Sequence, residues 1–288
     1  MRTLAVLFIA ACSTPPAEIE PDATPPDAAV EISGVFDPTG APTDPMSKHL
    51  QLGIPVDDSP ADDYLLIHDQ FAESYNHDHN SANWVSYLTT PSDFGPAERY
   101  AGPFYPDTTL PADWFHPDTD EYNRSGYDRG HMLRSEERTQ TEDQNIQTFV
   151  ISNVVPQTPD LNRGVWFDFE KYVQYKVQLY GKQMDAYELS GPVLPAPCMT
   201  HLPRTANDGC NDLGATTDPT QRIPIPTHTW KVVVFVPTGE PLATATDHQI
   251  EAVLMPNIAG IENDSWSKYK TTVAAIEAAT GYTFPSLH

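Results

Sequence analysis

Hydrophobic and polar positions alternate in several short runs after about residue 46, a pattern typical of half-buried β-strands. The runs are rich in valine, isoleucine, threonine and aromatic residues, and proline follows several of them. The predicted strands cover part of 64–72 and all of 83–90, 148–155, 187–194, 229–237, 242–247 and 250–255.

Hydrophobic residues at helical spacing predict two helices. Val165, Phe169 and Val173 share one face of a segment that follows the turn T-P-D-L-N. A second helix is predicted over 266–280, with Gly281 as its stop. Strands with interspersed helices and many prolines favour an α+β domain with a largely antiparallel sheet over regular βαβ winding.

Residues 1–11 carry one positive charge and a short apolar run that ends in small residues before Cys12. The run is too short to span a membrane, which takes about 20 apolar residues. It resembles a bacterial lipoprotein signal, which implies cleavage and lipidation at Cys12; the alternative is an ordinary secretion signal cut nearby. Both imply export, either to an outer-membrane anchor, which Ser13 favours, or to the periplasm or the exterior.

Residues 12–45 are mostly proline, alanine and acidic residues. Such a segment cannot bury enough apolar surface to fold, and its prolines keep it extended. We therefore expect a disordered tether. Residues 46–288 are numerous enough for one domain with a sizeable core.

The residues that carry chemistry lie between Tyr127 and Glu170. His131 has an ordinary pKa near neutral, as a general base for an attacking water requires. Arg129 offers a planar fork that matches phosphate oxygens. Asn162 offers a neutral amide oxygen, a ligand that leaves the full charge of a magnesium ion facing a phosphate. The set suits metal-assisted cleavage of a phosphodiester.

Asn162 is predicted at or just before the start of the first helix, and Asn153 on the strand 148–155. If the helix already runs at Asn162, Glu170 lies about 12 Å further along its axis, at 1.5 Å per residue. We therefore expect Glu170 to bind the waters of the ion or to orient its neighbours.

The run D-R-G-H is followed about thirty residues later by N-x-G-x-W, and a glutamate lies eight residues after that asparagine. This spacing resembles the DNA/RNA non-specific endonuclease family of the ββα-metal (His-Me finger) superfamily. Further family-like segments, such as N-W-V-S-Y from Asn83 and P-T-H-T-W-K from Pro226, extend the resemblance over nearly everything after residue 46. It implies a ββα-metal finger set in the antiparallel sheet, with flanking helices.

The resemblance also implies roles. His131 is the general base, Asn162 the protein ligand of Mg²⁺, with Mn²⁺ or other divalent cations as substitutes, and Glu170 supports the water shell of the ion. The other family positions fall on Asp128, Arg129, Asn153 and, as a candidate for an arginine upstream of the motif, Arg99. The products would carry 5′-phosphates.

Other charged residues have weaker claims. Arg124, Arg134, Arg138 and Arg163 either touch phosphates or are solvated surface charges, and Glu136 and Glu137 are expected at the surface. The sequence H-D-H at 77–79 is expected to be a polar turn rather than a metal site. Cys198 and Cys210 are expected to form a disulfide worth about 3 kcal/mol; the alternative is a zinc site with His201.

A formal net charge of −24 is unusual for a nucleic-acid-binding protein, whose affinity normally rests on lysine and arginine. Five arginines nevertheless lie between positions 124 and 163, so a local basic groove is compatible with the sequence. The sequence favours an exported, magnesium-dependent endonuclease that cuts DNA and RNA. Two alternatives are another metal-dependent phosphodiesterase with a small substrate, and a catalytically silent lipoprotein that binds a partner.

Overall fold

The computed structural model describes residues 47–179, 181–195, 210–245 and 248–287. The predicted signal, the tether, Cys198 and His201 lie outside these residues, so the lipid anchor, the disulfide and the zinc alternative stay predictions. None of the described helices is both long enough and apolar enough to cross a membrane.

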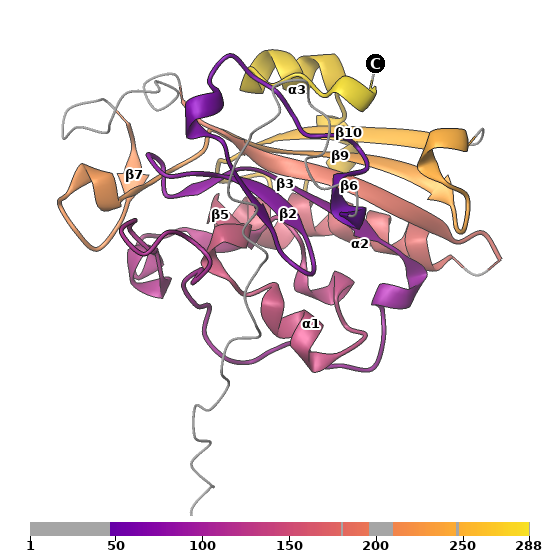
Figure 1. Ribbon diagram of the computed structural model, residues 1–288, viewed down its shortest axis with the longest axis horizontal. Helices are drawn as coiled ribbons and strands as arrows, with labels where there is room; N and C mark the ends of the chain where they lie inside the picture. The colour runs from indigo at the N-terminus through magenta and orange to yellow at the C-terminus, as the bar shows by residue number, and fades with distance from the viewer. Residues whose placement is uncertain (1–46, 180, 196–209, 246–247, 288) are drawn as a thin grey trace, which may run out of the picture.

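A six-stranded antiparallel sheet forms the centre of the domain (Figure 1). Its spatial order is β1-β2-β3-β6-β9-β10. The strands are β1 Tyr64–Ile67, β2 Ala72–Asn76, β3 Ser81–Thr89, β6 Met184–Val193, β9 His228–Pro237 and β10 Gln249–Pro256. The α+β class and the strands predicted over 83–90, 187–194, 229–237 and 250–255 are confirmed.

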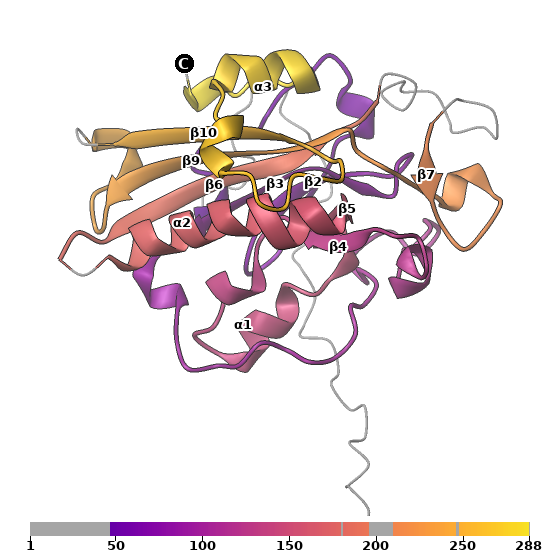
Figure 2. The same ribbon diagram turned by 180° about the vertical axis from the view of Figure 1, so that it is seen from behind.

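The sheet separates two hydrophobic cores, and its interior strand β9 is buried on both faces. Val233 and Phe235 face the core that α2 (Trp166–Gln178) covers, whereas Val232 and Val234 face a core that includes Ile276 of α3 (Val273–Thr280). Alternate residues of a strand point to opposite faces, so this valine-rich run serves both cores. Figures 1 and 2 show α2 and α3 on opposite faces of the sheet.

A smaller unit lies on the α2 side of the sheet. β4 (Asp128–His131) pairs antiparallel with β5 (Val154–Gln157), and α1 (Glu142–Gln147) lies in the connection between them. After β5 the chain makes a π-helical turn, Leu161–Val165, and enters α2. β4, β5 and α2 thus form the expected ββα finger, seen from the side of α2 in Figure 2. A further two-stranded sheet joins β7 (Asp212–Leu213) and β8 (Ile223–Pro224).

The turn before α2 depends on close backbone packing at Gly164. A Cβ atom there would lie 2.5 Å from the backbone oxygen of Glu262, a separation that real Cβ atoms do not tolerate. Val165, Phe169 and Val173 are buried in the core beneath the helix, as predicted.

The strand predicted over 148–155 is wrong in its extent. The chain forms a 3-10 turn at Ile151–Asn153, and β5 begins only at Val154 and continues through Pro156. The Asn153 side chain hydrogen-bonds the backbone of Leu133 and Thr148, which holds the turn in place of a straight strand.

Two other predictions need correction. Residues 242–247 were expected to form a strand, but Leu242–Thr244 is a 3-10 turn. The helix predicted over 266–280 is broken, because Lys270 bridges to Val253 of β10 and Thr271 donates its N–H to Ala252. Only the second part is α-helical: α3 begins after Thr272, which caps it, and ends at Gly281, whose φ of 84° is left-handed.

Candidate active site

A cavity of about 300 Å³ opens between β4, the π-helical turn and the start of α2. At about 30 Å³ per water, it has room for a phosphate group and a hydrated cation. Its lining includes five of the seven predicted site residues, Arg99, Arg129, His131, Asn162 and Glu170, together with Arg134, Glu136, Arg163 and Phe167. Asp128 is not among the lining residues but hydrogen-bonds Asn162 and Arg163, and Asn153 lies outside the cavity.

His131 ends β4 and is 8% exposed. Its ring packs against Phe104 and Phe149, with centroid distances of 5.0 and 5.2 Å. Burial, together with the nearby arginines Arg99, Arg134 and Arg129, lowers the pKa of His131 to about 3. The imidazole is therefore neutral at pH 7, and its Nε2 accepts no hydrogen bond from, and donates none to, the described residues.

Asn153 positions the backbone next to His131. Its Oδ1 accepts from the Leu133 N–H at 2.9 Å, and its Nδ2 donates to the carbonyls of Leu133 (2.9 Å) and Thr148 (2.8 Å). Its own carbonyl accepts from the Met132 N–H at 2.9 Å. These bonds use the whole side-chain amide inside the protein, so Asn153 supports the strand end that carries the histidine.

Asn162 lies in the π-helical turn, half-buried, beside Asp128. Its Nδ2 donates to Asp128 Oδ2 at 3.0 Å. An ionised carboxylate can only accept a hydrogen bond, so the amide atom that faces it must be the nitrogen, and this bond fixes which end of the amide is oxygen. The oxygen, the atom that a hard cation requires, points away from the carboxylate.

Asp128 is held by a second partner, Arg163. The guanidinium donates from Nε at 2.7 Å and from Nη2 at 2.6 Å. Burial opposes ionisation of Asp128, but the hydrogen bonds from Arg163 and Asn162 outweigh it and keep the pKa of the carboxyl below its ordinary value. Asp128 is thus ionised at neutral pH, and it orients the proposed metal ligand.

Glu170 lies on α2 and is buried except for its edge on the cavity, being 5% exposed. Burial raises the pKa of Glu170 to about 7 in spite of the nearby Arg134 and Lys231. Arg134 Nε lies 3.6 Å from Glu170 Oε2 and 3.0 Å from Glu136 Oε2, and its Nη1 donates to Gln174. The carboxyl therefore changes charge near neutral pH.

The arginines of the cavity differ in what they already bind. Arg99 pairs with Glu136 at 3.2 Å, and Arg134 and Arg163 have the acidic partners described above. Arg129 forms no ion pair with a described residue and lies over the rings of Phe104 and Tyr122, at 5.2 and 5.9 Å. Arg129 is consequently the arginine here whose charge is not already matched by a carboxylate.

Several residues expected at the surface are buried. Arg138 and Glu137 are fully buried and Arg134 is 7% exposed. Arg138 donates to the carbonyls of Gln70 and Leu88, which satisfy it inside the protein. Glu136 is half-buried and lines the cavity, whereas Arg163 and Arg124 are exposed, Arg124 away from the cavity.

Two residues of the cavity were not identified from the sequence. One is Glu136, which pairs with Arg99 and Arg134, and the other is Phe167. Phe167 is 37% exposed, with Arg134 and Lys171 lying 5.0 and 4.7 Å from its ring centroid. Phe167 lies outside the hydrophobic face of α2. A large aromatic residue at such a position of a helix is unusual, and this feature of the sequence could have indicated Phe167. The H-D-H segment at 77–79 is a turn between β2 and β3, as predicted.

The donors of the cavity fit a hydrated magnesium ion. Asn162 presents an oriented neutral oxygen, and Glu170 can accept hydrogen bonds from water held in the cavity. Mg²⁺ keeps most of its waters and needs few protein ligands. Chemically, the site combines a neutral imidazole, a place for a cation and an unmatched guanidinium.

Known proteins similar to this chain in sequence are nucleases. The family model described as DNA/RNA non-specific endonuclease matches residues 49–287. A protein named Nuclease from Nostoc sp. is 36% identical over 248 residues, covering 84% of this chain and 81% of the relative. Human mitochondrial endonuclease G is 27% identical, covering 76% of this chain and 69% of its own length.

The fold is also found in a solved structure. The crystal structure of the EndoG/EndoGI complex contains a chain that matches with a TM-score of 0.64 and 24% identity, over 83% of this chain and 90% of that one. The match supports the assignment of β4, β5 and α2 as a ββα-metal finger within a larger antiparallel fold. With its matched family model and its nuclease relatives, this chain belongs to the DNA/RNA non-specific endonuclease family and is a nucleic-acid hydrolase.

Proposed function

We propose that the protein is a magnesium-dependent endonuclease that hydrolyses DNA and RNA and leaves 5′-phosphate ends. One observation carries the proposal: a neutral His131 and an Asn162 amide, oriented by Asp128, line the same cavity as the unmatched Arg129. Base and phosphate ligand are thus supplied by β4, and the ion ligand by the neighbouring π-helical turn.

The chain's own groups divide the work of hydrolysis. Arg129 binds the scissile phosphate through its fork. His131 accepts the proton of the attacking water; a phosphate bound nearby raises the basicity of the imidazole by adding negative charge to a site that three arginines otherwise dominate. Asn162 would hold Mg²⁺, which stabilises the charge that develops on the phosphate and on the departing 3′ oxygen.

Glu170 and Arg134 position the water structure of the site. In its ionised form Glu170 accepts hydrogen bonds from waters beside Asn162, and Arg134 fixes the direction of that carboxylate. This follows the common arrangement in which carboxylates near a metal orient its waters.

Substrate binding rests on phosphate contacts and on one aromatic ring. The described cavity offers arginines for the backbone, and Phe167 at its rim offers a face on which an unpaired base can stack. Phosphate contacts and stacking carry little sequence information, which fits cleavage of both DNA and RNA. The acidic chain makes ground-state binding weak and strongly dependent on salt.

We further propose that the protein is exported and anchored through lipid at Cys12, with a disulfide between Cys198 and Cys210. The apolar run before Cys12 and the pair of cysteines in an exported chain support both features. Mass spectrometry of the mature N-terminus tests the anchor: an unmodified N-terminus beyond residue 12 would contradict it.

The nuclease proposal is tested by nicking of supercoiled plasmid with Mg²⁺ and with chelator, beside His131→Ala and Asn162→Ala. We expect Mg²⁺-dependent nicking that both variants lose, and nicks that DNA ligase reseals, because ligase requires a 5′-phosphate. A folded protein that cleaves small phosphodiesters but leaves the closed circle intact would favour the phosphodiesterase alternative. Inactivity on both substrates would favour the silent binding protein.

A further inference from the structure

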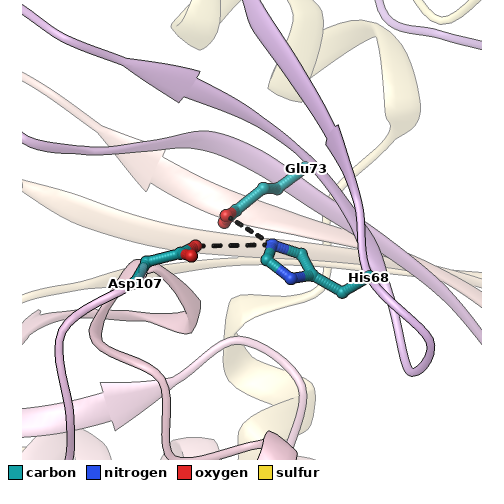
Figure 3. A group of neighbouring side chains, drawn as sticks. All are labelled: His68, Glu73 and Asp107. Atoms are coloured by element: carbon teal, nitrogen blue, oxygen red, sulfur yellow. Dashed lines mark hydrogen bonds and ion pairs between the residues drawn. The ribbon is translucent and has the colours of Figure 1, made fainter. Parts of the chain in front are cut away.

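A second cluster of metal-binding residue types lies inside the protein, outside the active-site cavity. His68 follows β1, Glu73 lies in β2, and Asp107 lies in the connection between β3 and β4. In Figure 3 the two carboxylates point toward the same edge of the His68 ring. His68 Nε2 lies 3.2 Å from Glu73 Oε1 and 3.5 Å from Asp107 Oδ2.

The cluster is buried and incompletely satisfied. Glu73 is fully buried and Asp107 is 3% exposed, while the side chain of His68 is 13% exposed. The Oε2 atom of Glu73 has no hydrogen-bond partner among the described residues. The nearby Ser152 hydroxyl donates its one hydrogen to Asp107 Oδ2 at 2.7 Å.

Without a metal ion, the charges of the cluster balance only if one of the two carboxyls is protonated, and burial raises the pKa of Glu73 in that direction. Neither Glu73 nor Asp107 forms an ion pair with a described lysine or arginine, and His68 contributes at most one positive charge. Two ionised carboxylates beside it leave at least one negative charge in the interior, which is costly. A divalent cation bound to the neutral imidazole and both carboxylates would bring the net charge of the cluster to zero.

The chemistry of the donors indicates the class of ion. One donor atom from each of the three residues lies within 4.8 Å of the others, so a single ion can reach all three. Zinc accepts imidazole nitrogen and carboxylate oxygen at about 2.0–2.2 Å, whereas magnesium prefers oxygen donors alone. We propose that His68, Glu73 and Asp107 bind a structural divalent cation of the zinc class, separate from the catalytic cation.

The proposed site lies where it can connect the β1–β2 hairpin to the segment that supports His131. Asp107 is tied through Ser152 to the 3-10 turn that precedes β5. Two residues before Asp107, Tyr105 exchanges backbone hydrogen bonds with Phe149 and Ile151, and the Phe149 ring contacts the His131 ring. An ion at the cluster would fasten the β1–β2 hairpin to the segment that packs behind the catalytic histidine.

The site is tested by titrating Zn²⁺ into metal-free protein by calorimetry, with thermal unfolding measured in parallel. The Asn162→Ala variant serves as the background, so that binding at the proposed magnesium site does not contribute. We expect one equivalent of Zn²⁺ that raises the midpoint of unfolding by several degrees. Both effects should be lost in Glu73→Gln and Asp107→Asn.

A matched control distinguishes the cluster from acidic surface in general. Asp57, Asp62 and Asp63 form another group of neighbouring carboxylates, without a histidine among them. Asp62→Asn in the same background should keep the zinc equivalent. Loss of binding in Asp62→Asn together with its retention in Glu73→Gln would overturn the proposal.

A third measurement needs no change in the cluster and so does not depend on whether the variants fold. Co²⁺ bound in place of zinc should give the visible absorption of a nitrogen- and oxygen-ligated ion of low coordination number, and Zn²⁺ should displace it. If the metal-free background protein binds neither ion, the cluster is held by protons and the proposal fails. None of these readouts depends on nuclease activity.

Discussion

Asp128→Ala should weaken magnesium activation without removing a group that contacts the ion. The change deletes the acceptor of the Asn162 Nδ2 hydrogen bond, so that the amide is free to turn its nitrogen toward the cation. A hydrogen bond to a charged group contributes about 1.5–3 kcal/mol. At about 1.4 kcal/mol per tenfold change, the magnesium concentration for half-maximal activity should rise roughly 10- to 150-fold.

The assay is the initial rate of plasmid nicking as a function of magnesium concentration. At saturating magnesium, Asp128→Ala should recover most of the parent rate, because the base and Arg129 are unchanged. Arg163→Gln is the matched control: it removes the other partner of Asp128 but keeps the bond to Asn162. The magnesium concentration for half-maximal activity of Arg163→Gln should stay within about twofold of the parent value.

Two results would refute this reasoning. If Asp128→Ala lowers the rate equally at every magnesium concentration, Asp128 acts on the phosphate or on the fold and not through the ligand. If Arg163→Gln shifts the magnesium dependence as much as Asp128→Ala does, the ion pair, and not the bond to Asn162, holds the metal site.

Three further predictions concern His131, Glu170 and Phe167. The pKa of His131 is lowered to about 3, so below pH 6.5 the unfolded chain binds more protons than the folded chain and the parent loses stability as the pH falls. Between pH 6.5 and 5, the free energy of unfolding of His131→Asn should therefore fall by about 2 kcal/mol less than that of the parent, as measured by urea unfolding. Equal losses in the two proteins would contradict the burial argument. Because the pKa of Glu170 is raised to about 7 and the ionised form is needed, the nicking rate should rise with pH through 7, and Glu170→Gln should lower the rate about 10- to 100-fold and flatten that rise. Phe167→Ala should reduce kcat/KM on single-stranded DNA by about 5- to 100-fold, with a smaller effect on duplex and recovery in Phe167→Trp; equal losses on both substrates would rule out base stacking.

Spacing in the sequence, together with the family resemblance, identified five of the residues that line the cavity. Asn162 lies in the turn before a helix that the hydrophobic pattern predicts, whereas His131 ends β4, whose sequence D-R-G-H has no hydrophobic pattern from which a strand could be predicted. Their approach follows from the antiparallel pairing of β4 with β5, which brings 128–131 beside 154–157. The order of the elements therefore fixes most of the catalytic geometry.

The sequence-based predictions failed for polar side chains whose hydrogen-bond partners are backbone groups far away in the sequence. Arg138 is fully buried because carbonyls of Gln70 and Leu88, 68 and 50 residues earlier, accept its hydrogen bonds. No local sequence pattern predicts such partners, so a charged residue in R-S-E-E-R is expected to be exposed. Asn153 is similar: its side chain replaces strand hydrogen bonds through contacts twenty residues away.

Net charge was a poor guide to the site for a related reason. The cavity and its support contain four arginines, Arg99, Arg129, Arg134 and Arg163, against three carboxylates, those of Asp128, Glu136 and Glu170. With all of these ionised, the local balance is only +1, and three of the arginines are already paired. A divalent cation would raise the balance to +3 at the point where the phosphate binds. In so acidic a chain, the cation is thus expected to contribute to substrate affinity as well as to catalysis, and nucleic-acid binding should fall sharply when the ion is chelated.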